Sequence, residues 1–178
     1  MEHNVLSHLS LQVGDCLKRH NAILSVAESC TGGLLASTVI ETAGSSQWFD
    51  RGFVTYTNQA KQDLLDVKSI TLETFGAVSE NTAAEMVRGV LTNIQSSSGY
   101  QTGRLDIAIS VTGIAGPDGG SPAKPVGMVC FGIGILSNYQ QLIRTTTQFF
   151  KGNRSAIRQQ SVKFALEQVL AIDYDGLR

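Results

Sequence analysis

The stretch AESCTGGLLASTVIE, residues 27–41, joins a strand-like segment to a helix-like one and so decides the fold. The apolar run that leads into it predicts a β-strand over 22–28, and the residues after the cysteine predict a helix over 32–43. The turn between them holds two hydroxyl side chains, a thiol and a glycine pair. Such a turn is either a plain helix cap or a place where the free N–H groups of the glycine turn bind a phosphate or hold a developing oxyanion.

Outward from this turn, strands and helices alternate at first, and strands follow one another later in the chain. This order predicts an α/β fold with three layers, α/β/α, around one mixed sheet. The predicted strands cover residues 22–28, 52–57, 105–113, 126–136 and 140–150. The predicted helices cover residues 4–19, 32–43, 58–67, 71–76, 79–95 and 153–171, with Asn58 and Ser79 as expected N-caps. No repeat or linker divides the chain, so residues 1–178 are expected to form a single domain.

The composition is that of an ordinary soluble protein, with 42% apolar and 16% charged residues and a formal net charge of −1. It offers no basic excess for nucleic acid and no apolar run long enough to cross a bilayer. The charged N-terminal segment is expected to form an amphipathic helix rather than a signal peptide. We therefore expect a cytoplasmic protein with neither a nucleic-acid nor a membrane partner. Three scattered cysteines and no Cys/His cluster predict neither a disulfide framework nor a metal site.

Three loops follow the strands that should be parallel, and such loops meet at one edge of a sheet. The first, 29–33, brings the hydroxyl groups of Ser29 and Thr31 together with the glycine pair. The second, 57–61, follows Tyr56 and ends at Lys61. The third, 112–120, is richer in glycine than a plain connection requires. The sequence predicts one cleft in which these three loops converge.

Lysine beside serine is a known substitute for histidine in acyl transfer, because a desolvated lysine loses pKa and becomes a base. All three histidines lie in the first twenty residues, which disfavours a Ser-His-Asp triad. Lys61 is therefore the candidate base, and the Tyr56 hydroxyl could relay a proton or hold the lysine. Ser29 is the favoured nucleophile, and Ser46 in GSSQWF remains a second candidate. Taken singly, each of these side chains could also have a purely structural role, at the surface or in the core.

Two arginines, Arg154 and Arg158, stand one turn apart at the start of the last predicted helix. They either reach a phosphate group or belong to a solvated helix face. A homodimer is expected, with apolar surface on 126–136 or on the terminal helices as its contact.

Six separated motifs occur in the order seen in one family: AESCTGGLLAS, GSSQWF, GFVTYTNQAK, FGAVSENTAAEM, SVTGIAGPDGGSPAKPVGMV and FKGNRSAIR. From about residue 5 to 172 the chain resembles the CinA C-terminal domain family in its stand-alone form. It departs from the common motifs at Thr57, Gln59 and Asn153, none of which is a proposed nucleophile or base.

The resemblance implies a CinA C-terminal-domain-like fold and an amidohydrolase of pyridine nucleotide recycling that needs no cofactor. Such an enzyme hydrolyses a small nucleotide: it converts nicotinamide mononucleotide and water to nicotinate mononucleotide and ammonia. Matched by motif, the catalytic candidates are Ser29, Ser46, Tyr56 and Lys61. The same matching implies that Thr31, Gly32, Gly33, Thr112 and Gly113 line the nucleotide site. A non-catalytic nucleotide-binding or regulatory module of the same family remains the alternative, and an oligomerisation domain is a third possibility.

Overall fold

A computed structural model describes residues 2–177 of the chain. Its strands are β1 (Ala22–Glu28), β2 (Phe49–Val54), β3 (Leu105–Gly113), β4 (Met128–Ser137) and β5 (Gln140–Phe149). Its α-helices are α1 (Glu2–Arg19), α2 (Leu34–Ile40), α3 (Asn58–Leu65), α4 (Ser69–Phe75), α5 (Glu80–Gln95) and α6 (Arg154–Leu170). Two short 3-10 helices, η1 (Ser45–Gln47) and η2 (Asp175–Leu177), complete the described elements.

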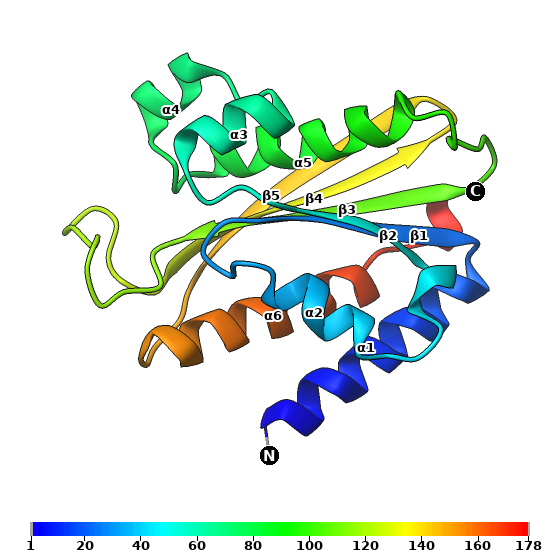
Figure 1. Cartoon of the computed structure of the whole chain (residues 1–178), viewed down its shortest axis with the longest axis horizontal. Helices are drawn as coiled ribbons and strands as arrows, with labels where there is room; N and C mark the ends of the chain where they lie inside the picture. The colour runs from blue at the N-terminus through cyan, green and yellow to red at the C-terminus, as the bar shows by residue number, and fades with distance from the viewer. Residues whose placement is uncertain (1, 178) are drawn as a thin grey trace.

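The five strands form one mixed sheet in the order β2-β1-β3-β4-β5. The first three are parallel, and β4 and β5 continue the sheet as antiparallel strands. Helices α1, α2 and α6 cover one face, and α3, α4 and α5 cover the other (Figure 1). Each face has its own apolar core. The predicted three-layer α/β/α fold with a mixed sheet is confirmed.

The ends of the parallel strands are in register, and this register positions the site. Glu28, the last residue of β1, pairs with Val54 on one side and with Val111 on the other. Beyond this row, the Ser29 N–H donates to the Val111 carbonyl at 2.9 Å, and the Thr55 N–H donates to the Glu28 carbonyl at 2.8 Å. The chain therefore leaves β1, β2 and β3 side by side at one edge of the sheet. The predicted convergence of their loops is confirmed.

Some element boundaries differ from those expected. Helix α2 begins at Leu34 rather than at residue 32, because Gly32 and Gly33 both have positive φ angles and form the turn. Strand β2 runs from Phe49 to Val54, three residues earlier than expected. The N-cap of α3 is Thr57, whose hydroxyl accepts the Ala60 N–H, so the expectation of Asn58 as cap was wrong.

Among residues 2–177, none of the helices combines the length and the apolar character that a membrane crossing requires.

Candidate active site

The centre of the site is the Lys61 amine, which lies between three oxygen atoms. Its Nζ donates to Ser29 Oγ at 3.0 Å, to the Thr55 carbonyl at 2.8 Å and to the Tyr56 carbonyl at 3.3 Å. Three residues lie between β2 and α3, so the first turn of the helix places Lys61 over the ends of the parallel strands. Only 1% of the lysine is exposed. The structure thus brings together the serine and lysine that the sequence places in separate loops.

Burial determines the chemical state of the two neighbouring titratable groups. Desolvation lowers the pKa of Lys61 from 10.5 to about 8, so a neutral amine is available near physiological pH. Desolvation raises the pKa of the adjacent Cys30 thiol to about 12. Because the thiolate is the reactive form of cysteine, Cys30 is no competing nucleophile. The charge states favour a serine nucleophile with a lysine base.

A cavity of about 250 Å³ opens over this pair of side chains. The lining residues are Ser29, Cys30, Tyr56, Lys61, Ala77, Val78, Thr112, Gly113, Ala115 and Arg154. Six of the predicted site residues therefore share one cavity. Cys30, Ala77, Val78 and Ala115 were missed by the sequence reasoning. Ala77 and Val78 carried only an indirect signal, their position between Gly76 and the Ser79 cap, whereas apolar wall residues resemble core residues in sequence.

Tyr56 contributes in a different way from the one expected. Its hydroxyl does not contact the Lys61 amine, which is held by the Tyr56 backbone carbonyl. The side chain is 60% exposed, and its hydroxyl accepts a hydrogen bond from Arg154 Nη2 at 3.3 Å. Arg154 Nη1 also donates to the Gly116 carbonyl at 2.9 Å. The arginine therefore links the loop after β2 to the loop after β3 at the cavity rim.

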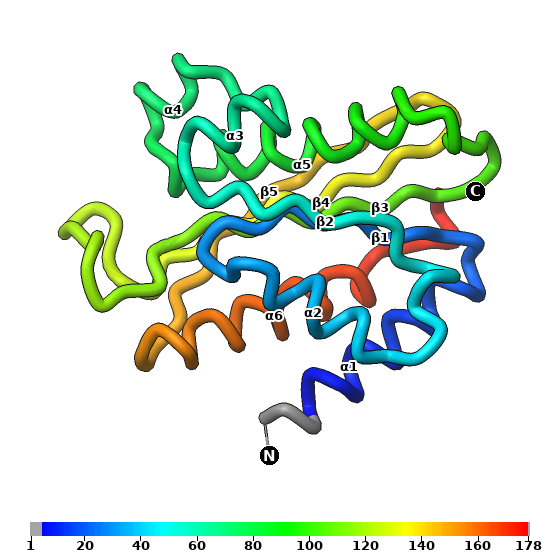
Figure 2. Tube along the Cα trace, in the orientation of Figure 1, coloured from blue at the N-terminus to red at the C-terminus, as the bar shows by residue number. Residues whose placement is uncertain are grey.

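Thr112 supports one wall of the cavity. It lies near the end of β3, and its hydroxyl donates to the Ala77 carbonyl at 2.7 Å. This hydrogen bond ties the segment between α4 and α5 to the sheet edge. On the same side, the Lys124 ammonium donates to the Phe75 carbonyl and fastens the long loop between β3 and β4 to α4. That loop extends beyond the sheet at this end (Figure 2).

The glycine turn does not present its N–H groups to the cavity as expected. The Gly32 N–H donates to the Ser29 carbonyl, and the Gly33 N–H donates to the Glu28 carboxylate. The Thr31 hydroxyl is buried and has no partner among the described residues, while the Thr31 carbonyl accepts two hydrogen bonds from Arg158. The expectation that the glycine N–H groups hold an oxyanion therefore needs correction. In the described part of the chain, the N–H groups of Cys30 and Thr31 have no backbone oxygen acceptor, and that of Cys30 interacts with its own thiol.

Ser46 is not brought to the site. It belongs to the exposed 3-10 helix η1, which precedes β2, whereas Ser29 and Lys61 lie beyond the carboxyl ends of the strands. Figure 2 shows the cyan segment before β2 at the other end of the sheet from the turn after β1. Because β1 and β2 are parallel, the length of β2 separates Ser46 from Lys61.

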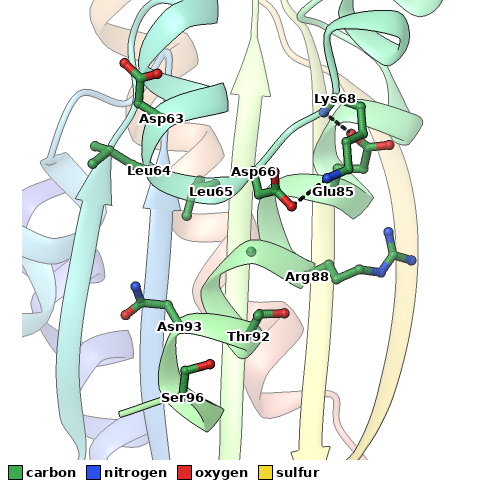
Figure 3. Close-up of a pocket in the computed structure, with 11 residues that line it drawn as sticks. Asp63, Leu64, Leu65, Asp66, Lys68, Glu85, Arg88, Thr92, Asn93 and Ser96 are labelled. Carbon is green, nitrogen blue, oxygen red and sulfur yellow. Dashed lines mark hydrogen bonds and ion pairs between the residues drawn. The ribbon is translucent and has the colours of Figure 1, made fainter.

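A second cavity, of about 350 Å³, lies between the end of α3 and the outer side of α5 (Figure 3). It contains none of the predicted site residues. The contacts drawn in Figure 3 hold the start of α4: Glu85 accepts the Lys68 N–H, and the Lys68 ammonium pairs with Asp66. Within residues 2–177, no group of three or more histidine, cysteine, aspartate or glutamate side chains could hold a metal ion.

Comparisons with known proteins give a consistent result. The model of a family described as the CinA C-terminal domain matches residues 6–172. Nicotinamide-nucleotide amidohydrolase PncC of Enterobacter agglomerans is 46% identical over 170 residues, which cover 96% of each chain. PncC of Escherichia coli strain K12 is 44% identical over 167 residues, 94% of each chain. A crystal structure of the competence/damage inducible protein CihA from Agrobacterium tumefaciens matches with a TM-score of 0.81 and 41% identity, covering 94% of each chain.

Proposed function

The chain belongs to the CinA C-terminal domain family, and on that premise we propose that it hydrolyses the carboxamide of nicotinamide mononucleotide to give nicotinate mononucleotide and ammonia. The observation that carries the proposal is the 3.0 Å contact between Lys61 Nζ and Ser29 Oγ in a cavity at the sheet edge. A serine with a desolvated lysine is suited to acyl transfer from an amide. The names of the two PncC relatives support the same substrate class.

The first step is attack of Ser29 Oγ on the carboxamide carbon. Once Lys61 is neutral, its two N–H groups match the carbonyls of Thr55 and Tyr56, and its lone pair faces Ser29. The serine hydroxyl then donates to Nζ and gives up its proton as the oxygen–carbon bond forms. The backbone thus holds the lysine in the orientation of a base rather than of a surface cation.

The second step expels ammonia and leaves an ester on Ser29. The carbon–nitrogen bond breaks as the amide nitrogen receives a proton, which originates from Lys61 and which Tyr56 helps to deliver. Because the Tyr56 oxygen accepts from Arg154, its own O–H is free to donate toward the cavity. Water, deprotonated by the same lysine, then hydrolyses the ester and releases nicotinate mononucleotide.

Negative charge on the carbonyl oxygen is stabilised by the N–H groups next to Ser29. Cys30 and Thr31 supply these donors, because the glycine N–H groups are already bonded within the turn. In known enzymes, each such donor contributes about 3 kcal/mol.

The cavity accepts the reacting pyridine end and leaves the ribose phosphate at the rim. Arg154 is exposed there and is the proposed phosphate ligand, while Thr112 and Gly113 line the inner wall. Thr31, Gly32 and Gly33 act on the substrate through the shape of the Ser29 turn rather than through side-chain contact. The homodimer and the cytoplasmic location expected from the sequence remain predictions.

Incubation of the purified protein with nicotinamide mononucleotide, with ammonia and nicotinate mononucleotide as readouts, tests the proposal. We expect equal amounts of both products, and the same rate after EDTA treatment. Thermal stabilisation by the nucleotide without turnover would contradict the proposal and favour a binding module. Neither stabilisation nor turnover would favour an oligomerisation or partner-binding domain.

A further inference from the structure

Glu28 is a buried acidic residue that the proposed reaction does not use. It ends β1, immediately before Ser29, and is fully inaccessible to solvent. Acidic side chains are almost never fully buried unless their charge is compensated. Among the described residues no lysine, arginine or histidine forms an ion pair with Glu28, so its compensation comes from elsewhere.

The compensation comes from the first N–H groups of α2. Glu28 Oε2 accepts the N–H groups of Gly33 and Leu35 at 3.0 Å each, and Oε1 accepts that of Ala36 at 2.8 Å. The N–H of Leu34 donates to the Thr31 carbonyl, so the start of the helix is fully bonded. A carboxylate that accepts three N–H groups acts only as an acceptor, as the ionised form does.

This arrangement replaces a cap that the local sequence does not provide. The N-cap position is Gly33 with a φ angle of 90°, and glycine has no side chain that could accept a hydrogen bond. A residue with a Cβ atom would be strained at this φ angle, so a serine or threonine cap is disfavoured there. The positive φ angle of the turn requires glycine at the N-cap position. The capping carboxylate is therefore supplied by Glu28 of the preceding strand.

We propose that Glu28 is a positioning residue: its carboxylate ties the end of β1 to the start of α2, across the turn that carries Ser29, and so holds the nucleophile at hydrogen-bond distance from Lys61. The inference rests on the proposed role of Ser29. Four residues lie between Glu28 and Gly33, and the β1 register with β3 fixes the near end of this loop. The three hydrogen bonds fix the far end, and Arg158 holds the Thr31 carbonyl between them.

The hydrogen bonds of Glu28 also prevent the start of α2 from binding an anion. A helix start attracts anions through its free N–H groups and its dipole. Here the N–H groups are occupied and a negative charge lies among them. The substrate phosphate is therefore directed away from the glycine turn, toward the arginine at the rim.

The first test replaces Glu28 with glutamine, which keeps the shape but turns an amide donor toward the N–H groups. For Glu28→Gln we expect kcat to fall about 10- to 100-fold with KM within about threefold, because small displacements of reacting groups cost rate more than binding. Glu85→Gln is the matched control, because Glu85 also holds a helix start from outside that helix, accepting the Lys68 N–H and the Thr71 hydroxyl at α4, and does not touch the Ser29 turn. It should keep kcat within about twofold of the wild-type value.

The second test is chemical rescue. Glu28→Ala removes a group of the size of acetate, and the N–H groups that it leaves unpaired should bind that ion. We expect acetate to raise the kcat of Glu28→Ala at least about tenfold in a saturable manner, whereas chloride at the same ionic strength should not. The amide resonances of Gly33, Leu35 and Ala36 should shift with acetate in this variant and not in the wild type.

The outcomes separate this inference from the proposed function. A wild type that releases no ammonia would refute the function, while the amide shifts would still test the cap. If Glu28→Gln keeps kcat within twofold, the positioning role is wrong, and this variant decides the matter should Glu28→Ala fail to fold. If acetate shifts the amides but restores no activity, Glu28 is a structural cap only and the proposal is overturned.

Discussion

At the scale of single residues, the chemistry of the site depends on one desolvated amine. Lys61 has three oxygen neighbours, of which only Ser29 Oγ belongs to a side chain that can lose a proton to it. The other two are backbone carbonyls that orient the amine and cannot exchange protons with it. This asymmetry distinguishes a candidate base from a lysine that merely satisfies a buried carbonyl.

Replacing Lys61 with methionine keeps most of the side-chain volume and removes the base. We expect kcat/KM to fall by about 10²- to 10⁴-fold, the range for loss of a general base. Lys68→Met is the matched control, since Lys68 lies on the surface in an ion pair with Asp66. A loss smaller than about tenfold in Lys61→Met would exclude the lysine as the base.

The pH dependence of the reaction should follow the titration of Lys61. Burial lowers its pKa to about 8, and the neutral amine is the active form, so activity rises with pH. We expect log kcat/KM to increase with a slope near one below the pKa and to level off above about pH 8. Initial rates between about pH 6 and 9.5 would reveal this break. A value of log kcat/KM that still rises with a slope near one up to about pH 9.5, as expected for the ordinary lysine value of 10.5, would contradict the description of the buried amine.

At the scale of secondary-structure elements, the position of Lys61 depends on how closely α3 approaches α5. Gly89 makes this approach possible: a Cβ atom on Gly89 would lie 2.2 Å from the Leu65 carbonyl oxygen at the end of α3. Leu65 follows Lys61 by one helical turn. A change on α5 should therefore reach the base through the backbone of α3.

Gly89→Ala tests this coupling, because two effects of the substitution change the stability of the protein in opposite directions. Helix propensity alone would stabilise the protein by up to about 1 kcal/mol. Overpacking against Leu65 should outweigh it and destabilise the protein by about 1–3 kcal/mol, with a lower kcat as α3 shifts. Urea unfolding and kcat measure both. Gly99→Ala, which meets no atom within 4 Å, is the control. A more stable Gly89→Ala variant would refute the close approach.

The elements that the sequence predicts best are those with a single strong signal. Strands β1 and β3 have the expected bounds, because each is an apolar run between polar turns. The predicted start of α2 was two residues too early because Gly32 and Gly33 have positive φ angles and extend the turn. A glycine can also be helical, so the sequence alone does not give these angles. The cap of α2 escaped prediction because it comes from Glu28, outside the helix. A charged residue closing a buried strand was the one available signal.

At the scale of the whole molecule, the two ends of the sheet have different roles. The site lies at the carboxyl end of the parallel strands, and Trp48 anchors the opposite end. Trp48 is 1% exposed and fills the space left by Gly14 of α1. The sequence predicted that three loops converge, which identified Ser29, Tyr56 and Lys61. Ser46 was kept as a candidate because of its motif, although it precedes the strand predicted over 52–57 and so belongs to the other end of a parallel strand.

Trp48→Ala should therefore separate stability from activity. We expect a loss of about 3–5 kcal/mol in the free energy of unfolding, as for other buried aromatic residues. Because the site lies at the other end of β2, kcat of the folded fraction should stay within about twofold of the wild type. Far-UV circular dichroism in urea and initial rates at low temperature measure both quantities. A large fall in kcat without loss of stability would contradict this division of roles.

The most direct test of the Ser29–Lys61 site is the rate of ammonia release from nicotinamide mononucleotide by Ser29→Ala and Ser46→Ala. Removal of the nucleophile should lower kcat by at least about 10³-fold in Ser29→Ala, with the fold and melting temperature preserved. Ser46→Ala, altered at the far end of β2, should keep the wild-type rate within about twofold. If Ser29→Ala retains most of the rate, or if Ser46→Ala is the inactive variant, the account of the site is wrong.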